Sequence, residues 1–249
     1  MPPCPPWPYP RLIAHRGGGR LAPENTLAAM RAGRARGYAM VEFDAKLSRD
    51  GMPILLHDDT LERTTDGAGP AAGHDFAELA ALDAGSWHSP AYAGEPVPTL
   101  RALARYTLAN GLASNVEIKP CPGRERETGL AVARAAAALW QDAAVPPLLS
   151  SFSETALAAA AGAAPALPRA LLVDRGLLPD WRERAARHGC VALNIAHEDA
   201  SPELVAAAHG AGLRIAAWTV NDPARARLLL DWGVDAIFTD ALDLIPADS

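Results

Sequence analysis

The stretch IAHRGGGRLAPENTLAAM, residues 13–30, has the pattern of a β-strand end, a glycine-rich turn and a helix start. The apolar segment reaches His15 and Arg16 and is followed directly by three glycines, which let a backbone and a ligand approach closely. Pro23 and Asn25 suit the start of the following helix, and a capping role for them is at least as well supported as a direct functional one. The stretch therefore predicts a strand–turn–helix unit with polar side chains at the carboxyl end of its strand.

Similar units recur along most of the chain, because short β-like segments alternate with alanine-rich helical segments. The expected strands are Arg11–His15, Met40–Asp44, Asn115–Ile118, Leu148–Ser151, Arg169–Val173, Val191–Ile195, Arg214–Trp218 and Ala236–Phe238. The expected helices include Asn25–Arg36, Glu125–Trp140, Trp181–Arg187, Pro202–Ala211 and Pro223–Trp232. Several strands are continuously apolar, as expected of parallel strands that are buried on both faces. The pattern predicts an α/β fold, a (β/α)₈ TIM barrel, although a doubly wound sheet shares its local signals.

The chain length and one irregular interval define the expected domain organisation. A chain of 249 residues is the usual size for one barrel, and no composition break divides it, so we expect a single domain over residues 1–249. The interval between His57 and Thr99 is rich in turn signals and holds only a short helical piece at Ala77–Leu82. We expect an insertion at about residues 59–98, after the second strand. It is either a substrate-binding excursion at the catalytic face or a plain surface loop.

Composition excludes several classes of protein. The formal net charge of −6 argues against a nucleic-acid binder that relies on a basic patch. Cys4, Cys121 and Cys190 are too few for a disulfide framework, and without a CxxC pair a structural zinc site is not expected. The first residues lack the pattern of a secretory signal, and no apolar run is long enough to span a bilayer. We therefore expect no membrane span and a cytoplasmic location.

Carboxylates gather on two of the expected strands, in the segments MVEFDAKL and NVEIKP. Glu42 and Asp44 are two residues apart, so on a strand they point to the same side, opposite Phe43, and Glu117 and Lys119 are related in the same way. Buried like charges are costly unless a positive charge holds them together. Oxygen ligands favour Mg²⁺ or Ca²⁺ over zinc. A metal-free ion-pair network around Lys119 is the alternative, and the repetition of the arrangement on two strands favours the metal.

Two histidines and two cations stand near these carboxylates in the expected fold. His57 ends the run MPILLH and is followed by two aspartates that could orient its ring, and His15 ends the first strand. Cleavage of a phosphodiester needs one group that accepts a proton and one that donates a proton. It also needs positive charge at the phosphoryl oxygens, which Arg16, Lys119 and a metal could supply. The residue types match that reaction.

The last two strands also end in candidate residues. Trp218, Thr219 and Asn221 follow the apolar part of the seventh strand, and we interpret Trp218 as a platform for the carbon skeleton of a substrate. Asp240 comes directly after the eighth strand, and we interpret it as the cap of a last helix.

Taken together, the motifs resemble those of the glycerophosphodiester phosphodiesterase family. They are HRG…PENT, E-x-D, HD, DAGSW…GEPVPTL, EIKP, SSF, WTVN and GVDAIFTD, in the expected order from residue 11 to about residue 240. Each motif is short, but their joint occurrence is specific. The resemblance implies a (β/α)₈ barrel with a small insertion after strand two. It also implies metal-dependent hydrolysis of small glycerophosphodiesters to sn-glycerol 3-phosphate and an alcohol.

The resemblance also implies roles for individual residues. By similarity, the metal ligands are Glu42, Asp44 and Glu117, the acid–base pair is His15 and His57, and the phosphate-binding residues are Arg16 and Lys119. The implied mechanism uses the glycerol 2-hydroxyl as nucleophile and passes through a cyclic phosphate, with His15 assigned as the base of the first step. Phe43 and Ala236 depart from the common Leu and Gly of such proteins and remove no catalytic group.

Rival readings are a phosphatidylinositol phospholipase C-like barrel, a sphingomyelinase D-like barrel and a non-catalytic phosphate-binding barrel. The headgroup, the choice between Mg²⁺ and Ca²⁺, the oligomeric state and the role of Cys121 stay open.

Overall fold

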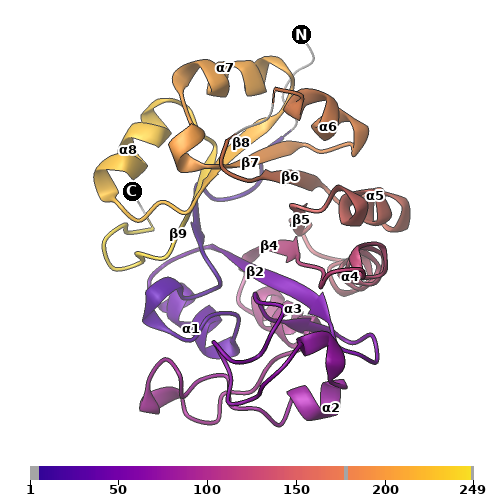
Figure 1. Cartoon of the computed structure of the whole chain (residues 1–249). Coiled ribbons are helices and arrows are strands. Elements are labelled where there is room, and N and C mark those ends of the chain that lie inside the picture. The colour runs from indigo at the N-terminus through magenta and orange to yellow at the C-terminus, as the bar shows by residue number, and fades with distance from the viewer. Residues whose placement is uncertain (1–5, 177–178, 248–249) are drawn as a thin grey trace.

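The computed structural model describes residues 6–176 and 179–247 and contains a closed parallel β-barrel (Figure 1). Within these ranges, eight parallel strands are bonded in the order β1-β9-β8-β7-β6-β5-β4-β2, and the pairing of β1 with β2 closes the ring. The strands are β1 (Leu12–Ala14), β2 (Met40–Leu47), β4 (Ala113–Ile118), β5 (Leu148–Ser151), β6 (Arg169–Val173), β7 (Ala192–Ala196), β8 (Arg214–Trp218) and β9 (Ala236–Thr239). The predicted α/β TIM barrel is therefore confirmed.

Helices surround the barrel on its outer side (Figure 1). They are α1 (Leu27–Ala35), α3 (Leu100–Ala109), α4 (Glu125–Leu139), α5 (Glu154–Ala163), α6 (Trp181–Arg187), α7 (Pro202–Gly210) and α8 (Pro223–Asp231). Several begin where a side-chain oxygen accepts a backbone N–H of the first turn, as N-caps do. The capping residues are Thr26, Thr99, Ser153, Ser201 and Asp222. No helix among residues 6–176 and 179–247 is long and apolar enough to cross a membrane.

Two apolar layers hold the barrel together. The larger layer lies between the strands and the helices and includes Phe43, which is fully buried. The smaller layer joins inward-facing residues such as Ile13 and Leu148 with Tyr9, whose hydroxyl donates to the carbonyl oxygen of Pro146 at 3.0 Å. Tyr9 and Pro146 precede β1 and β5, so their contact lies at the amino-terminal end of the barrel. Barrel enzymes have their active sites at the opposite, carboxyl end of the strands.

The interval between β2 and α3 contains a short strand that the sequence did not reveal. This strand, β3 (Pro53–Leu55), runs antiparallel to β2. The insertion that follows contains α2 (Phe76–Leu79) and has its own small core. That core consists of Ile54, Leu56, Leu61, Ala71, Leu79, Ala84 and Val97. The insertion lies against the first helix (Figure 1), where Glu95 accepts a hydrogen bond from the backbone N–H of Ala28 at 2.9 Å.

Candidate active site

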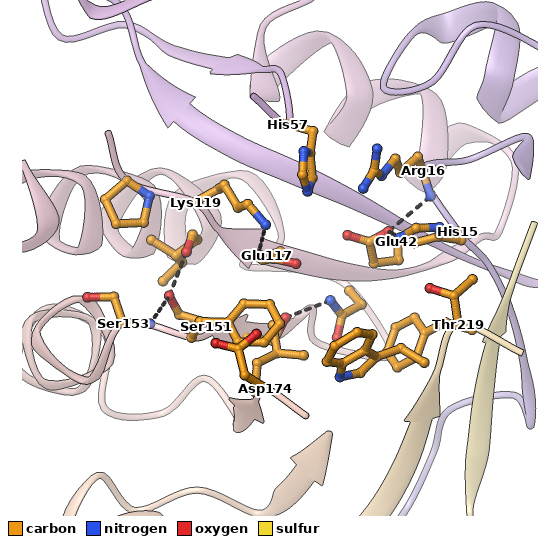
Figure 2. A pocket seen from close by; sticks show the side chains of 18 of the residues that line it. His15, Arg16, Glu42, His57, Glu117, Lys119, Ser151, Ser153, Asp174 and Thr219 are labelled. Atoms are coloured by element: carbon orange, nitrogen blue, oxygen red, sulfur yellow. Dashed lines mark hydrogen bonds and ion pairs between the residues drawn. The ribbon is translucent and has the colours of Figure 1, made fainter. Parts of the chain in front are cut away.

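A cavity of about 720 Å³ opens at the carboxyl ends of the strands. Figure 2 shows His57, Arg16 and Lys119 converging on the region of Glu42 and Glu117. The predicted site residues that line the cavity are His15, Arg16, Glu42, His57, Glu117, Lys119 and Trp218. Asp44 is buried and does not line the cavity, but it belongs to the same group of carboxylates. The structure thus brings together every residue that the sequence predicted for the site.

The three carboxylates form a compact buried cluster. One oxygen from each of Glu42, Asp44 and Glu117 lies within 4.8 Å of the others, and the register of β2 with β4 places Asp44 beside Glu117. Burial and the charge of Asp44 raise the pKa of Glu42 to about 8 and that of Glu117 to about 7. The Oε1 of Glu42 is buried and has no hydrogen-bond partner. A hard divalent cation would supply the missing positive charge and a partner for this oxygen, so the cluster fits such an ion.

Asp44 is held in place by Asn25, which the sequence suggested as a capping residue. Thr26 caps α1 instead, and Asn25 adopts a left-handed backbone with φ of 60°. Its side-chain nitrogen donates to Asp44 Oδ2 at 2.8 Å, and its oxygen accepts the backbone N–H of Asp44 at 2.9 Å. Asparagine tolerates this backbone conformation better than most residues. Asn25 therefore orients a carboxylate of the cluster.

His15 is held by Asp240, for which the predicted capping role is wrong. A turn, not a helix, follows Asp240 in the described part of the chain. Its Oδ1 lies 2.6 Å from the Nδ1 of His15, and its Oδ2 accepts a hydrogen bond from Asn221 at 3.2 Å. Burial opposes the charged imidazolium, but Asp240 and Glu42 outweigh it and raise the pKa of His15. Asp240 therefore fixes the ring and favours its protonated form.

Gly19 explains how Asp240 comes so close to His15. A Cβ at Gly19 would lie 2.2 Å from the backbone oxygen of Asp240, so only glycine fits there. The sequence predicted a close approach of a backbone and a ligand at the three glycines. For Gly19 a close approach is confirmed, and the group that approaches is the backbone of Asp240. None of the three is among the residues that line the cavity.

His57 follows β3, and its Nδ1 lies 2.7 Å from Asp58 Oδ1. Asp58 is thus the aspartate that orients the ring, while Asp59 lies 3.4 Å from the Nζ of the buried Lys46. Burial lowers the pKa of His57, and the positive charges of Arg16 and Lys119 lower it further. The ring is therefore neutral at neutral pH. With Nδ1–H donated to Asp58, its Nε2 is free to accept a proton.

Arg16 and Lys119 bring positive charge to the cavity. The backbone of Arg16 is left-handed, with φ of 49°, and its N–H donates to Glu42 Oε2 at 2.9 Å. Its guanidinium donates to Glu24 at 2.7 Å, and the Nζ of Lys119 lies 2.9 Å from Glu117 Oε1. Both side chains line the cavity, so an anionic ligand would meet two cations there.

Trp218 lines the same cavity at the end of β8. Its ring packs edge-to-face against Phe152, with centroids 5.6 Å apart, and its Nε1 is buried without a hydrogen-bond partner. An apolar ring is thus available beside the charged groups.

From the sequence, Glu24 and Arg63 had no assigned role and Asp240 was interpreted as a cap. For Asn25, a capping role was at least as well supported as a functional one. Arg63 follows Asp58 by five positions in HDDTLER, and its guanidinium bonds both Asp58 and Glu24. The nearness of this arginine to the predicted HD pair was the available signal. Nothing local marks Asp240, because its partner His15 lies at the other end of the chain.

The model of the Glycerophosphoryl diester phosphodiesterase family matches residues 15–244. The chain belongs to this family. The family predicted from the sequence motifs is therefore confirmed, and with it the enzyme class, a glycerophosphodiester phosphodiesterase.

Similar family members cover nearly the whole chain. The Bacillus subtilis protein YhdW is 35% identical over 243 residues, which are 95% of this chain and 97% of that protein. A glycerophosphodiester phosphodiesterase of Caldanaerobacter subterraneus is 31% identical over 233 residues, covering 92% of this chain and 93% of its own. The structure of an Oleispira antarctica phosphodiesterase in complex with its product sn-glycerol-3-phosphate has a TM-score of 0.88 and 37% identity. The match covers 96% of this chain and 95% of that one.

Proposed function

We propose that this chain hydrolyses glycerophosphodiesters to sn-glycerol 3-phosphate and an alcohol, with the help of a bound Mg²⁺ or Ca²⁺. The observation that carries the proposal is that two histidines, two cations and a buried carboxylate cluster meet at one cavity. The Oleispira antarctica relative, which was captured with sn-glycerol-3-phosphate, supports the same product here.

The carboxylate cluster is the proposed metal site. Glu42, Asp44 and Glu117 would hold the ion, and Asn25 would keep Asp44 in position. An all-oxygen set suits Mg²⁺ or Ca²⁺. When bound, such an ion supplies positive charge to the phosphoryl oxygens.

Arg16 and Lys119 are the proposed phosphate-binding residues. Both side chains line the cavity. Arg16 bonds Glu24 and Lys119 contacts Glu117, so both cations are oriented before a substrate binds. Charge-assisted hydrogen bonds from these groups would hold the phosphoryl oxygens while the bond to the leaving alcohol breaks.

The two histidines differ in a way that suggests separate roles. His57 has a lowered pKa and a free Nε2, so it would accept the proton of the glycerol 2-hydroxyl as that oxygen attacks phosphorus. His15 has a raised pKa, so it would donate a proton to the alcohol oxygen as the P–O bond breaks. Water would then open the cyclic phosphate while the two histidines exchange roles. This order reverses the sequence-based assignment of His15 as the first base.

Trp218 would contact the glycerol part of the substrate. Its ring and that of Phe152 provide apolar surface beside the charged groups.

The deciding experiment is coupled detection of glycerol 3-phosphate released from glycerophosphocholine and glycerophosphoethanolamine. The protein is treated with EDTA and then supplied with Mg²⁺, Ca²⁺ or Mn²⁺. We expect release to stop with the chelator and to return with one of the metals. No release with any metal and either headgroup would refute the proposal, and phosphatidylinositol would then test the phospholipase-like alternative.

A further inference from the structure

Arg63, a residue of the insertion, lies between two carboxylates, those of Asp58 and Glu24. Its Nε and Nη2 donate to the two carboxylate oxygens of Asp58, at 2.6 and 2.9 Å. Its Nη1 and Nη2 donate to the two carboxylate oxygens of Glu24, at 2.7 and 2.8 Å. One guanidinium thus binds two carboxylates, each through both oxygens.

Each of these carboxylates has a second partner that lines the cavity. Asp58 orients His57, with 2.7 Å between Oδ1 and Nδ1, and Glu24 accepts from Arg16 Nη1 at 2.7 Å. The contacts form one continuous network, in the order His57, Asp58, Arg63, Glu24 and Arg16. This network joins the turn after β3 to the loop after β1.

We propose that Arg63 is a positioning residue that holds the His57–Asp58 pair and the Arg16–Glu24 pair in one fixed relative geometry. This inference rests on the proposed function, in which His57 transfers a proton and Arg16 binds the phosphoryl group. Arg63 does not line the cavity, so it acts through its two carboxylate partners.

The insertion is what places Arg63 at this point. Leu61, two residues earlier, is buried in the core of the insertion. Thr65, two residues later, donates both its hydroxyl and its backbone N–H to the carbonyl oxygen of Leu61, at 2.7 and 3.0 Å. The turn that carries Arg63 is thus fixed on both sides, and the small core of the insertion is linked to the catalytic groups.

The chemistry of the bridge favours arginine over lysine. Hydrogen bonds from Arg63 hold the pKa of Asp58 well below its usual range. Although burial opposes ionisation of Glu24, Arg63 and Arg16 hold its pKa below the usual range as well. Both partners are therefore ionised at neutral pH, and they would repel each other without the cation between them. A planar guanidinium has donors in a fixed fork that can serve two carboxylates at once, whereas an ammonium is a point charge.

The test compares Arg63→Ala with Arg49→Ala as a matched control. Arg49 is also half-exposed and bonds Asp75, Glu78 and the carbonyl oxygen of Gly73 within the insertion. In the described part of the chain, no hydrogen bond or ion pair joins these three partners to a residue of the site. We expect Arg63→Ala to lower kcat by about 10- to 100-fold, the scale of a misplaced catalytic group, with a smaller change in KM. Arg49→Ala should stay close to wild type. Guanidinium ion at low, non-denaturing concentration should restore part of the activity of Arg63→Ala and none to the control.

A double-mutant cycle and a conservative variant complete the test. If Arg63 acts through Asp58, then Arg63→Ala should cost much less in an Asp58→Ala background, since residues of one network are not additive. Arg63→Lys, which retains the charge, should still lose activity and decides the question if the alanine variant does not fold.

The inference is overturned if Arg63→Ala or Arg63→Lys keeps the kcat of wild type, or if the loss is equally large without Asp58. A wild-type protein that releases no glycerol 3-phosphate would instead refute the proposed function.

Discussion

The Nδ1 of His15 and the Oδ1 of Asp240 lie 2.6 Å apart, although the two residues are separated by 225 positions in the chain. The contact exists because β1 and β9 are neighbours in the closed barrel, with Ala14 paired to Thr239. It directs the Nε2 side of the His15 ring toward Glu42, whose Oε2 lies 3.8 Å away. Barrel closure therefore sets the orientation of one of the two histidines.

Replacing Asp240 by Asn should move the alkaline limb of the pH profile to lower pH. His15 is proposed to act in its protonated form, so activity is lost as the pH rises through its pKa. Asp240 helps to raise that pKa, and removing its charge lowers it, so the loss should begin at lower pH. Measurement of kcat/KM across the neutral and alkaline range checks this. Asp243→Asn, an exposed change in the same terminal turn, is the control, and an unmoved limb in Asp240→Asn would argue against His15 as the acid.

Loss of either histidine should abolish most of the turnover. We expect His15→Ala and His57→Ala each to lower kcat by about 10²-fold or more, the scale of general acid–base catalysis. The acidic limb of the pH profile should also disappear in His57→Ala. In the wild type, His57 acts in its neutral form, and its lowered pKa means that this form is lost only at acidic pH. His74→Ala in the insertion serves as control, since its ring nitrogens contact the carbonyl oxygen of Ala68 and the carboxylate of Glu78, which both belong to the insertion. Near wild-type kcat in a site variant would remove that histidine from its role.

Glu42→Gln should weaken binding of Mg²⁺ or Ca²⁺. The amide keeps the size of the side chain and can still accept the backbone N–H of Arg16, so the change removes charge more than shape. Changes at the groups that support metal ligands commonly cost about 10- to 100-fold in metal affinity, and we expect a change at a ligand to cost at least as much. Titration calorimetry with each ion measures this, with Glu203→Gln on α7 as the control. Unchanged affinity would favour the metal-free ion-pair network around Lys119.

The barrel could be predicted from the sequence because its signals are local. The apolar run that ends at Val173 marks a buried parallel strand, and the observed strand, Arg169–Val173, has the predicted bounds. The alternation in β2 also predicted correctly that Glu42 and Asp44 share one side. The short strand β3 was missed, because three residues with no clear alternation give no periodic signal.

The supporting contacts of the site could not be predicted in the same way. Asn25, Arg63 and Asp240 have residue types that suit caps and surface loops. Local patterns favoured a cap for Asp240 and left a cap or a functional role open for Asn25. Their partners are set by tertiary structure, as when Asn25 bonds Asp44, nineteen positions away. The groups expected to touch substrate could be predicted from their residue type and their position at the end of a strand. The groups that orient them could be identified only from the folded structure.

Phe43→Ala should lower the stability of the fold without changing metal binding, because Phe43 and the carboxylates lie on opposite faces of β2. Phe43 is fully buried in the layer between barrel and helices, whereas its neighbours Glu42 and Asp44 face the barrel interior. Truncation of a buried Phe typically costs about 3–5 kcal/mol of unfolding free energy, and denaturant unfolding measures it. Metal affinity of the folded fraction should stay near that of wild type, because the lost side chain lies on the far side of the strand. A fall in affinity as large as that of Glu42→Gln, in protein that is still folded, would mean that the two faces are coupled. The strand would then control the carboxylates through its packing and not only through its alternation.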